Sequence, residues 1–187
     1  MDIFEAMKGR RSIRKYKTDP VDEGTIESVL DAARWAPSWA NTQCWRFVVI
    51  RQAETKARIA EALRPGNPAT DAVRSAPVVI VACAQLGRSG YKRGEAMTSK
   101  GDWFMFDVAL AMQNLTLAAH AKGLGTVHVG LFDAKKVEEI LQVPQGITVV
   151  ELTPLGYPDE QPEEPGRKAL SEIVFYEKYA EPRQSAT

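Results

Sequence analysis

The amino-acid sequence predicts a layered domain of the α/β or α+β class, and three observations carry this prediction. Residues 77–84, PVVIVACA, form a near-continuous apolar run, as expected of a strand that is covered on both faces. Residues 102–122 carry Ala, Leu, Met and Phe on nearly every side of a helix, which predicts a long, buried central helix. Strand and helix patterns alternate elsewhere, and their connections vary in length, which favours a mixed sheet.

The first half of the chain shows one well-defined amphipathic helix. In residues 22–35 the apolar residues Ile26, Val29, Leu30 and Ala33 recur at helical spacing, and Pro37 ends the helix. The other expected elements are a short helix at 2–8 stopped by Gly9, a strand at 45–50, a helix at 54–63 and a loop at 64–70.

The second half continues with a polar, glycine-bearing segment at 85–100, which we expect to be a mobile excursion. Gly123 is a candidate cap after the central helix, because glycine readily adopts the left-handed conformation found there. The remaining elements are a strand at 125–130, a helix at 133–141 with Asp133 as its N-cap, a strand at 147–155 ended by a turn, a loop at 161–168 and a frayed tail from about 181.

Length and composition predict one domain without a net charge of either sign. The chain has 187 residues, 44% of them hydrophobic, which is enough for one sizeable core, so a single domain over 1–187 is expected. A formal net charge of +0 argues against a protein that coats nucleic acid or an anionic membrane. No apolar stretch approaches the length of a membrane span, and the start MDIFEAMKG lacks the basic and apolar regions of a signal peptide.

The cysteines and histidines point to a cytoplasmic protein without a metal. Cys44 and Cys83 have no CxxC spacing and form no disulfide framework, which favours a reducing compartment. Together with His120 and His128 they do not form a ligand cluster at metal spacing, so no metal site is expected.

A basic segment near the N-terminus is the first candidate site. The stretch RRSIRKYK follows the glycine that stops the first helix, and in extended conformation Arg10, Ser12 and Arg14 would share one side. Two guanidinium groups and a hydroxyl suit the dianionic end of a phosphate monoester. A solvated run of charge is the plainer alternative, and nucleic acid binding is a poor one because the chain has no net basicity.

The second candidate site is the segment at 33–50, ARWAPSWANTQCWRFVVI. A loop displays Ser38, Asn41 and Gln43 beside aromatic residues, which are groups able to read a planar heterocycle with an amide edge. Ordinary capping of a turn by Ser and Asn is equally compatible with the pattern. No strand is followed by GxGxxG, and GLGTVHVG precedes a strand rather than a helix, so the dinucleotide fingerprint is missing.

Five pieces taken together resemble the FMN-dependent nitroreductase family. They are RRSIR, PSWANTQCW, the central DWFMFDVALAMQNLTLAAHAKGLGT, LGYP and GRKAL, in this order from about residue 3 to 179. The resemblance implies an α+β fold, a three-layer α/β/α sandwich with a mixed, mainly antiparallel sheet. It also implies a homodimer with FMN at the subunit interface, and NAD(P)H as the electron donor.

The resemblance assigns the cofactor-binding residues by position. It implies that the basic segment grips the phosphate and ribityl end of FMN, with Arg167 and Lys168 approaching from the C-terminal side. The loop at 37–43 would lie near the flavin ring, partly from the partner subunit, and the backbone at 128–130 would lie by the reactive edge of the ring. The full set is Arg10, Arg11, Ser12, Arg14, Pro37, Ser38, Asn41, Gln43, His128, Val129, Gly130, Arg167 and Lys168.

Three further features of the resemblance are less direct. Cys44 stands where the family commonly has Pro, which removes a rigid φ from the loop. Asp107 is a conceivable general acid, but within an apolar helix it is more often a structural anchor. The substrate-side candidates are Trp39, Trp103 and Phe104, although such aromatic residues more often belong to a core or dimer interface.

The sequence thus predicts an oxidoreductase in which the flavin carries the chemistry and no side chain is a catalytic nucleophile. We expect ping-pong turnover between NAD(P)H and an electron-poor small molecule such as a nitroaromatic or a quinone. The alternatives are a reductive dehalogenase or flavin-consuming enzyme on the same scaffold, and an FMN-binding module without turnover. The physiological substrate and the choice between NADH and NADPH have no readable motif.

Overall fold

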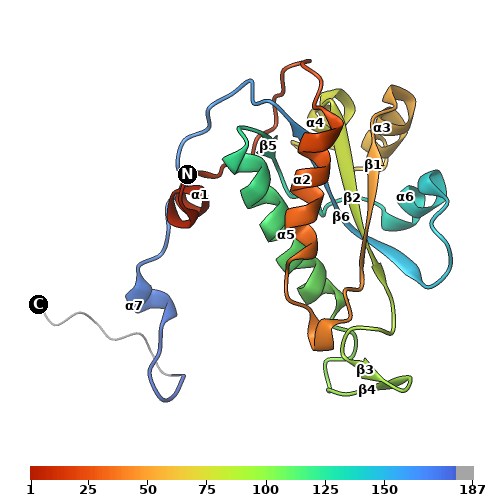
Figure 1. The fold of residues 1–187 in the computed structure, drawn as a ribbon, viewed down its shortest axis with the longest axis vertical. Coiled ribbons are helices and arrows are strands. Elements are labelled where there is room, and N and C mark those ends of the chain that lie inside the picture. Colours follow the sequence, from red (N-terminus) through yellow and green to blue (C-terminus); the bar gives the residue numbers. More distant parts are fainter. Residues whose placement is uncertain (180–187) are drawn as a thin grey trace, which may run out of the picture.

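The fold is a four-stranded antiparallel sheet with helices on both faces, in a computed structural model that describes residues 1–179 (Figure 1). The strands are β1 (Trp45–Ile50), β2 (Val78–Gln85), β6 (Ile147–Gly156) and β5 (Gly125–Thr126), in the order β1-β2-β6-β5. Each neighbouring pair of strands is antiparallel, and the parallel contribution is the isolated bridge between Ser12 and Thr126. The expected mixed, mainly antiparallel sheet is therefore confirmed.

Strand β2 lies at the centre of two hydrophobic cores, one on each face of the sheet. Val78 and Ile80 belong to the first core, whereas Val79 and Val81 belong to the second. This alternation follows from the pleat of a strand, in which successive side chains point to opposite faces. The apolar run at 77–84 therefore marks a strand that is covered on both sides, as the sequence predicts.

Two sets of helices complete the three layers. Helices α2 (Glu23–Arg34) and α5 (Phe104–Ala121) contribute to the first core, and α1 (Ile3–Gly9) contacts α5. Helices α3 (Ala53–Ala60), α4 (Thr70–Ser75) and α6 (Ala134–Leu141) contribute to the second core. The predicted three-layer α/β/α arrangement is confirmed.

The helix boundaries follow the capping residues in the sequence. The side chains of Asp2, Asp22 and Asp133 accept backbone N–H groups at the start of α1, α2 and α6. Gly123, two residues after α5, has φ +77°, the left-handed conformation expected of a glycine after a helix.

Two elements differ from the predictions. The strand expected over 125–130 is wrong beyond Thr126, because the N–H of Val127 is donated to the side chain of Thr153 at 3.2 Å and regular pairing stops there. An isolated bridge between Val129 and Leu152 keeps the segment beside β6. Helix α4 was not predicted, since its six residues are too few to show a helical period.

Helix α5 is long and central, and one side of it is exposed. Val108, Met112 and Leu115 are fully buried against the sheet and α2. Met105 and Phe106 are 57% and 55% exposed. Large apolar side chains on an otherwise buried helix mark a surface made for contact with another molecule.

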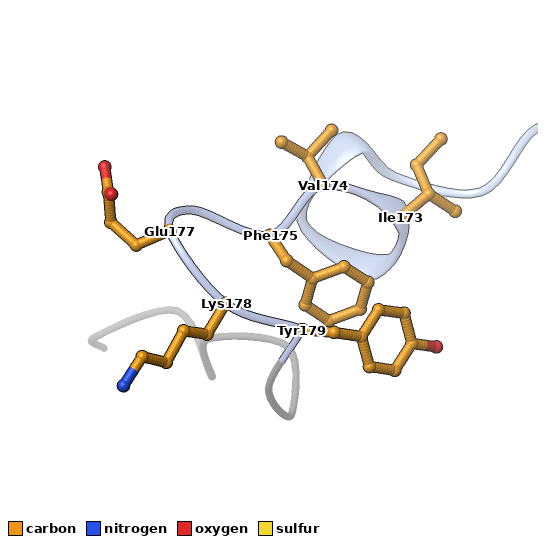
Figure 2. A pocket seen from close by; sticks show the side chains of 6 residues that line it. All are labelled: Ile173, Val174, Phe175, Glu177, Lys178 and Tyr179. Carbon is orange, nitrogen blue, oxygen red and sulfur yellow. The ribbon is translucent and has the colours of Figure 1, made fainter.

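The excursion and the C-terminal segment are the irregular parts of the fold. Residues 85–100 contain a small hairpin, β3 (Tyr91–Lys92) with β4 (Glu95–Ala96). After β6 the chain runs past α1 and away from the sheet to the short helix α7 (Leu170–Ile173) (Figure 1). Beyond α7 the rings of Phe175 and Tyr179 stack with centroids 4.4 Å apart, beside a hollow formed by this segment alone (Figure 2). The predicted frayed tail from about 181 lies outside the described residues.

Within residues 1–179 no helix combines the length and apolar character needed to span a membrane.

Candidate functional site

The basic segment lies along the edge of the sheet beside β5. The N–H of Ile13 is donated to the carbonyl of Thr126 at 2.9 Å, and Ile13 is buried. Its side chain packs so closely on Gly125 that a Cβ there would lie 2.8 Å away, which explains a glycine at this position. Backbone pairing and a buried isoleucine therefore hold the neighbouring arginines in place, and the segment is extended as predicted.

Positive charge accumulates where this segment leaves α1, a region that we call the arginine corner and define as Arg10, Arg11, Arg167 and His120. Burial, followed by the charges of Arg11 and Arg167, lowers the pKa of Arg10. Burial, followed by Arg10 and Arg11, also lowers the pKa of His120. The ring of His120 lies near the end of α1, because a Cβ on Gly9 would approach its Nε2 to 2.9 Å.

The arginine corner contains a buried donor without a partner. Among the residues that the structure describes, the buried Nη1 of Arg10 has no hydrogen-bond partner. A buried, unpaired donor of a charged group is costly, and native structures normally satisfy it. A phosphate group would satisfy Arg10 and neutralise the surrounding cations, so the corner fits the phosphate end of FMN.

Acidic residues after β6 lie over the basic segment. Glu160 accepts the N–H of Lys15 at 3.2 Å and also that of Arg14, and Glu164 pairs with Arg11 at 3.3 Å. The Glu164 side chain is 73% exposed, so this ion pair adds little stability and an anion could replace it. Arg167 donates to the carbonyls of Pro165 and Gly166, at 3.1 and 3.0 Å, while Lys168 and Arg14 are exposed.

The second predicted site, the loop at 38–43, has a constrained backbone. Ala40, Asn41 and Gln43 have φ of 45°, 54° and 46°, which non-glycine residues rarely adopt. The hydroxyl of Ser38 accepts the N–H of Gln43 at 3.0 Å, and Gln43 Nε2 donates to Asn41 Oδ1 at 3.1 Å. Such strain persists only where the surroundings determine the conformation.

Asp107 on α5 holds the loop at 38–43 in this conformation. Its carboxylate is completely buried and accepts the N–H of Trp39 at 3.0 Å and the hydroxyl of Thr42 at 3.4 Å. The Sγ of Cys44 lies 3.7 Å from the same carboxylate, so the thiol donates a bond that a proline could not. Burial, with Asp107 next, raises the pKa of Cys44 to about 12. These contacts favour a structural role of Asp107 over a role as general acid.

Aromatic side chains gather beside this loop. The rings of Trp39 and Trp103 have centroids 5.3 Å apart, and Phe106 meets Trp103 edge-on at 5.6 Å. Phe104 instead packs against the first core. The structure therefore places Trp39 and Trp103 together and Phe104 apart from them. Phe106, which the sequence analysis missed, is the third member of the cluster; its apolar character within an apolar helix gave no signal.

The segment 128–130 lines a cavity of about 340 Å³ against the exposed side of α5. His128 and Gly130 lie on one wall with Glu151 of β6, and Met105, Ala109 and Gln113 of α5 lie on the other. Val129 is buried and contributes its backbone bridge to Leu152. Glu151 was not predicted as a site residue, because a single acid within an apolar strand pattern does not identify its partner.

One chain does not bring all of the predicted residues together. The arginine corner includes His120, near the end of α5, whereas the loop at 38–43 is bonded to Asp107 near its start. Thirteen residues separate the two, which corresponds to about 20 Å along a helix. A separate hollow of about 430 Å³ contains Pro37, Asn41 and Gln43 together with the exposed Trp35. The predicted residues thus lie in three groups. The arginine corner lies at the end of α5, the loop at 38–43 lies near its start, and residues 128–130 lie beside Met105, Ala109 and Gln113 on its exposed side.

Within residues 1–179 no group of three or more His, Cys, Asp or Glu side chains is placed to hold a metal ion.

Known proteins resemble the chain in both sequence and fold. A sequence model of the Nitroreductase family matches residues 7–75 and 66–157. A putative NADH dehydrogenase/NAD(P)H nitroreductase from Methanothermobacter thermautotrophicus is 34% identical over 166 residues, covering 87% of this chain and 80% of the relative. A 5,6-dimethylbenzimidazole synthase from Rhodospirillum rubrum is 31% identical over 170 residues, covering 81% and 80%. The structure of an FMN-dependent nitroreductase from Clostridium difficile R20291 has a TM-score of 0.78 at 25% identity, covering 93% of this chain and 99% of that one.

The matched residues include the basic segment, the strained loop and the walls of the cavity at His128. The family model therefore spans all four strands of the sheet, the central helix and every predicted site residue except Arg167 and Lys168. The chain belongs to the nitroreductase family.

Proposed function

We propose that this chain is an FMN-dependent NAD(P)H oxidoreductase that reduces electron-poor small molecules such as quinones or nitroaromatics. The observation that carries the proposal is the arginine corner, where a buried guanidinium nitrogen lacks a partner among surrounding cations. Similarity to an FMN-dependent nitroreductase supports FMN as the ligand, and similarity to an NAD(P)H nitroreductase supports the electron donor.

The residues of one chain suffice for the phosphate end and for one edge of the ring. Arg10, Arg11, Ser12 and Arg14 would hold the phosphate and ribityl groups, with Arg167 and Lys168 completing the cradle. The pairing of Ser12 with Thr126 leads directly to residues 128–130, so the ring would lie over the cavity at His128. When bound, FMN supplies the hydride chemistry, and the protein orients it and shields it from water.

A second copy of the chain would complete the site. The loop that carries Pro37, Ser38, Asn41 and Gln43 is held by the buried Asp107, whereas the cavity at His128 lies on the exposed side of α5. The loop residues would therefore reach the flavin bound to a partner subunit. The exposed apolar side chains of α1 and α5 support a homodimer through this face. They are Ile3, Phe4, Met7, Met105 and Phe106. The C-terminal segment after β6, which leaves the body of its own chain, would pack on the partner.

The donor and the acceptor would take turns at one open face, which makes the kinetics ping-pong. Trp39 and Trp103 supply aromatic surface on which a planar acceptor can stack. We further propose that residues 1–187 act as one FMN-binding domain in the cytoplasm, where two free, buried cysteines are stable.

A flavin-consuming enzyme is the second candidate, because a relative named 5,6-dimethylbenzimidazole synthase is 31% identical to this chain. In that case the flavin would be the substrate, and its absorbance would disappear irreversibly during aerobic turnover.

The test is the visible absorption spectrum of the purified chain, before and after anaerobic addition of NADPH and then NADH. We expect a flavin spectrum that bleaches and returns when a quinone or nitroaromatic is added. A bound flavin that never bleaches would indicate a binding module without turnover. A colourless protein that takes up no added FMN would overturn the proposal.

A further inference from the structure

The cavity beside α5 contains an imidazole paired with a carboxylate. His128 Nδ1 lies 2.9 Å from Glu151 Oε2, within hydrogen-bond distance. The His128 side chain is 38% exposed and the Glu151 side chain is 16% exposed, so the carboxylate is shielded while the imidazole reaches the solvent side. A contact of this kind on an open surface contributes little stability, so its placement needs another explanation.

The pairing leaves one ring nitrogen for the cavity. A carboxylate accepts but does not donate, so Nδ1 carries the proton of this hydrogen bond. Nε2 is then the nitrogen that can exchange a proton with a molecule in the cavity. The α5 wall supplies Met105, Ala109 and the uncharged Gln113, so Glu151 is the charged neighbour of the imidazole among the lining residues.

We propose that His128 is a catalytic residue that donates a proton from Nε2 to the bound acceptor, and that Glu151 positions its imidazole. This inference rests on the proposed function and adds a protein side chain to a reaction otherwise left to the cofactor. Carboxylate-oriented imidazoles are effective acids and bases because the carboxylate fixes the tautomer and the ring orientation.

The atoms and electrons of the proposed step balance when the acceptor is a quinone. Two-electron reduction needs one hydride equivalent, which originates on NAD(P)H, and one proton. The proton leaves Nε2 of the imidazolium form of His128, which carries a proton on each ring nitrogen. The N–H bond breaks as the O–H bond of the hydroquinone forms, and the neutral imidazole left behind keeps its proton on Nδ1. NAD(P)H is oxidised to NAD(P)⁺, the quinone is reduced, and solvent returns a proton to the imidazole.

The test compares two acceptors in the FMN-loaded, full-length protein. A quinone needs a proton, whereas ferricyanide takes single electrons and needs none. We expect His128→Gln to lower the ratio of the quinone rate to the ferricyanide rate about 100-fold, and Glu151→Gln to lower it about tenfold. Glu139→Gln, the same change on the exposed side of α6, is the matched control and should leave the ratio unchanged.

The ratio of the quinone rate to the ferricyanide rate also distinguishes failure of this inference from failure of the proposed function. Equal losses with both acceptors would overturn the proton role, because they would report lost flavin or lost structure. A wild-type protein that reduces neither acceptor would overturn the proposed function itself, and this inference with it.

A second measurement is independent of turnover. In ¹⁵N-labelled full-length chain, imidazole correlation spectra of the neutral form of His128 should show its single proton on Nδ1, the tautomer that is left after Nε2 has given up its proton. Glu151→Gln should shift this signal and redistribute the tautomers, while Glu139→Gln should not. A His128 tautomer that is indifferent to Glu151→Gln would overturn the positioning role.

Discussion

The two ends of helix α5 hold charge in opposite ways. At its C-terminal end the arginine corner gathers cations, and a nitrogen of Arg10 is buried without a partner. At its N-terminal end the buried carboxylate of Asp107 accepts bonds from Trp39, Thr42 and Cys44. The first end thus has a buried donor without a partner among the described residues, whereas the carboxylate at the second end has its partners within the chain. Under the proposed function, unsatisfied charge marks where the phosphate would bind, and satisfied charge marks what holds the loop at 38–43 in place.

The largest expected effect comes from removing charge at the arginine corner and at Arg14 of the adjoining basic segment. Arg10→Ala with Arg14→Ala should lower FMN affinity roughly 100-fold or more, because each charged hydrogen bond to phosphate contributes about 1.5–3 kcal/mol. Flavin fluorescence titration measures the affinity, and Arg88→Ala, on the exposed excursion, is the control. Unchanged affinity in the double variant would remove the corner from the site.

Removing the charge of Arg10 alone should not destabilise the FMN-free protein. Arg10→Met removes a half-buried guanidinium that has one buried, unpaired nitrogen, and it keeps most of the packing. The FMN-free variant should therefore unfold at an equal or higher temperature. A clear fall in melting temperature of the FMN-free chain would show that Arg10 is a structural residue and would weaken the contrast between the two ends.

At the other end of α5, removing charge should destabilise the chain. Asp107→Asn replaces one accepting oxygen by an amide donor and leaves buried donors of the loop unpaired, at a cost of about 1–3 kcal/mol. Urea unfolding of the FMN-free protein measures the loss. Stability equal to that of the wild type would show that the loop does not depend on this carboxylate.

A smaller effect, a gain in the free energy of unfolding, is expected from a change within the loop at 38–43. Ala40 has φ 45° and ψ 32°, a left-handed conformation that glycine adopts without steric cost. Ala40→Gly should therefore change the free energy of unfolding by no more than about 1 kcal/mol, in the stabilising direction. Ala57→Gly, in the regular helix α3, should destabilise by a similar amount and serves as the opposite control. Two losses of equal size would show that the loop carries no strain.

The smallest effect concerns pH at the arginine corner. Burial, then Arg10 and Arg11, lowers the pKa of His120, so the unfolded chain binds a proton at higher pH than the folded chain does. Stability from this residue is complete above about pH 6.5 and is lost as the pH falls through the lowered pKa. His120→Gln should reduce the loss of stability between about pH 7 and pH 5, measured by urea unfolding. An unaltered pH profile would place His120 away from the cations.

Sequence periodicity predicted most of the fold, because buried strands and capped helices carry local signals. The run at 77–84 and the aspartate caps are examples, and they coincide with β2, α1, α2 and α6. The segment after Thr126 escaped prediction, since its N–H groups are bonded to the side chain of Thr153 and to Leu152, far along the chain. Local pattern cannot reveal such partners.

The candidate site shows the same division. RRSIR is a dense local cluster, so its basic character was visible in the sequence, whereas the missing partner of Arg10 depends on burial by the rest of the chain. Glu151 became visible only through its 2.9 Å contact with His128. Whether the predicted residues bind FMN stays a prediction for the titrations above.

The two cysteines have a consequence for chemical durability. Quinones are electrophiles that add to thiolates, and an enzyme that reduces them meets such an electrophile at every turnover. Burial raises the pKa of Cys44 to about 12 and that of Cys83 to about 11, and both side chains are inaccessible. Neither sulfur offers a nucleophile to a Michael acceptor, so the folded chain resists arylation by the compounds that we propose it reduces.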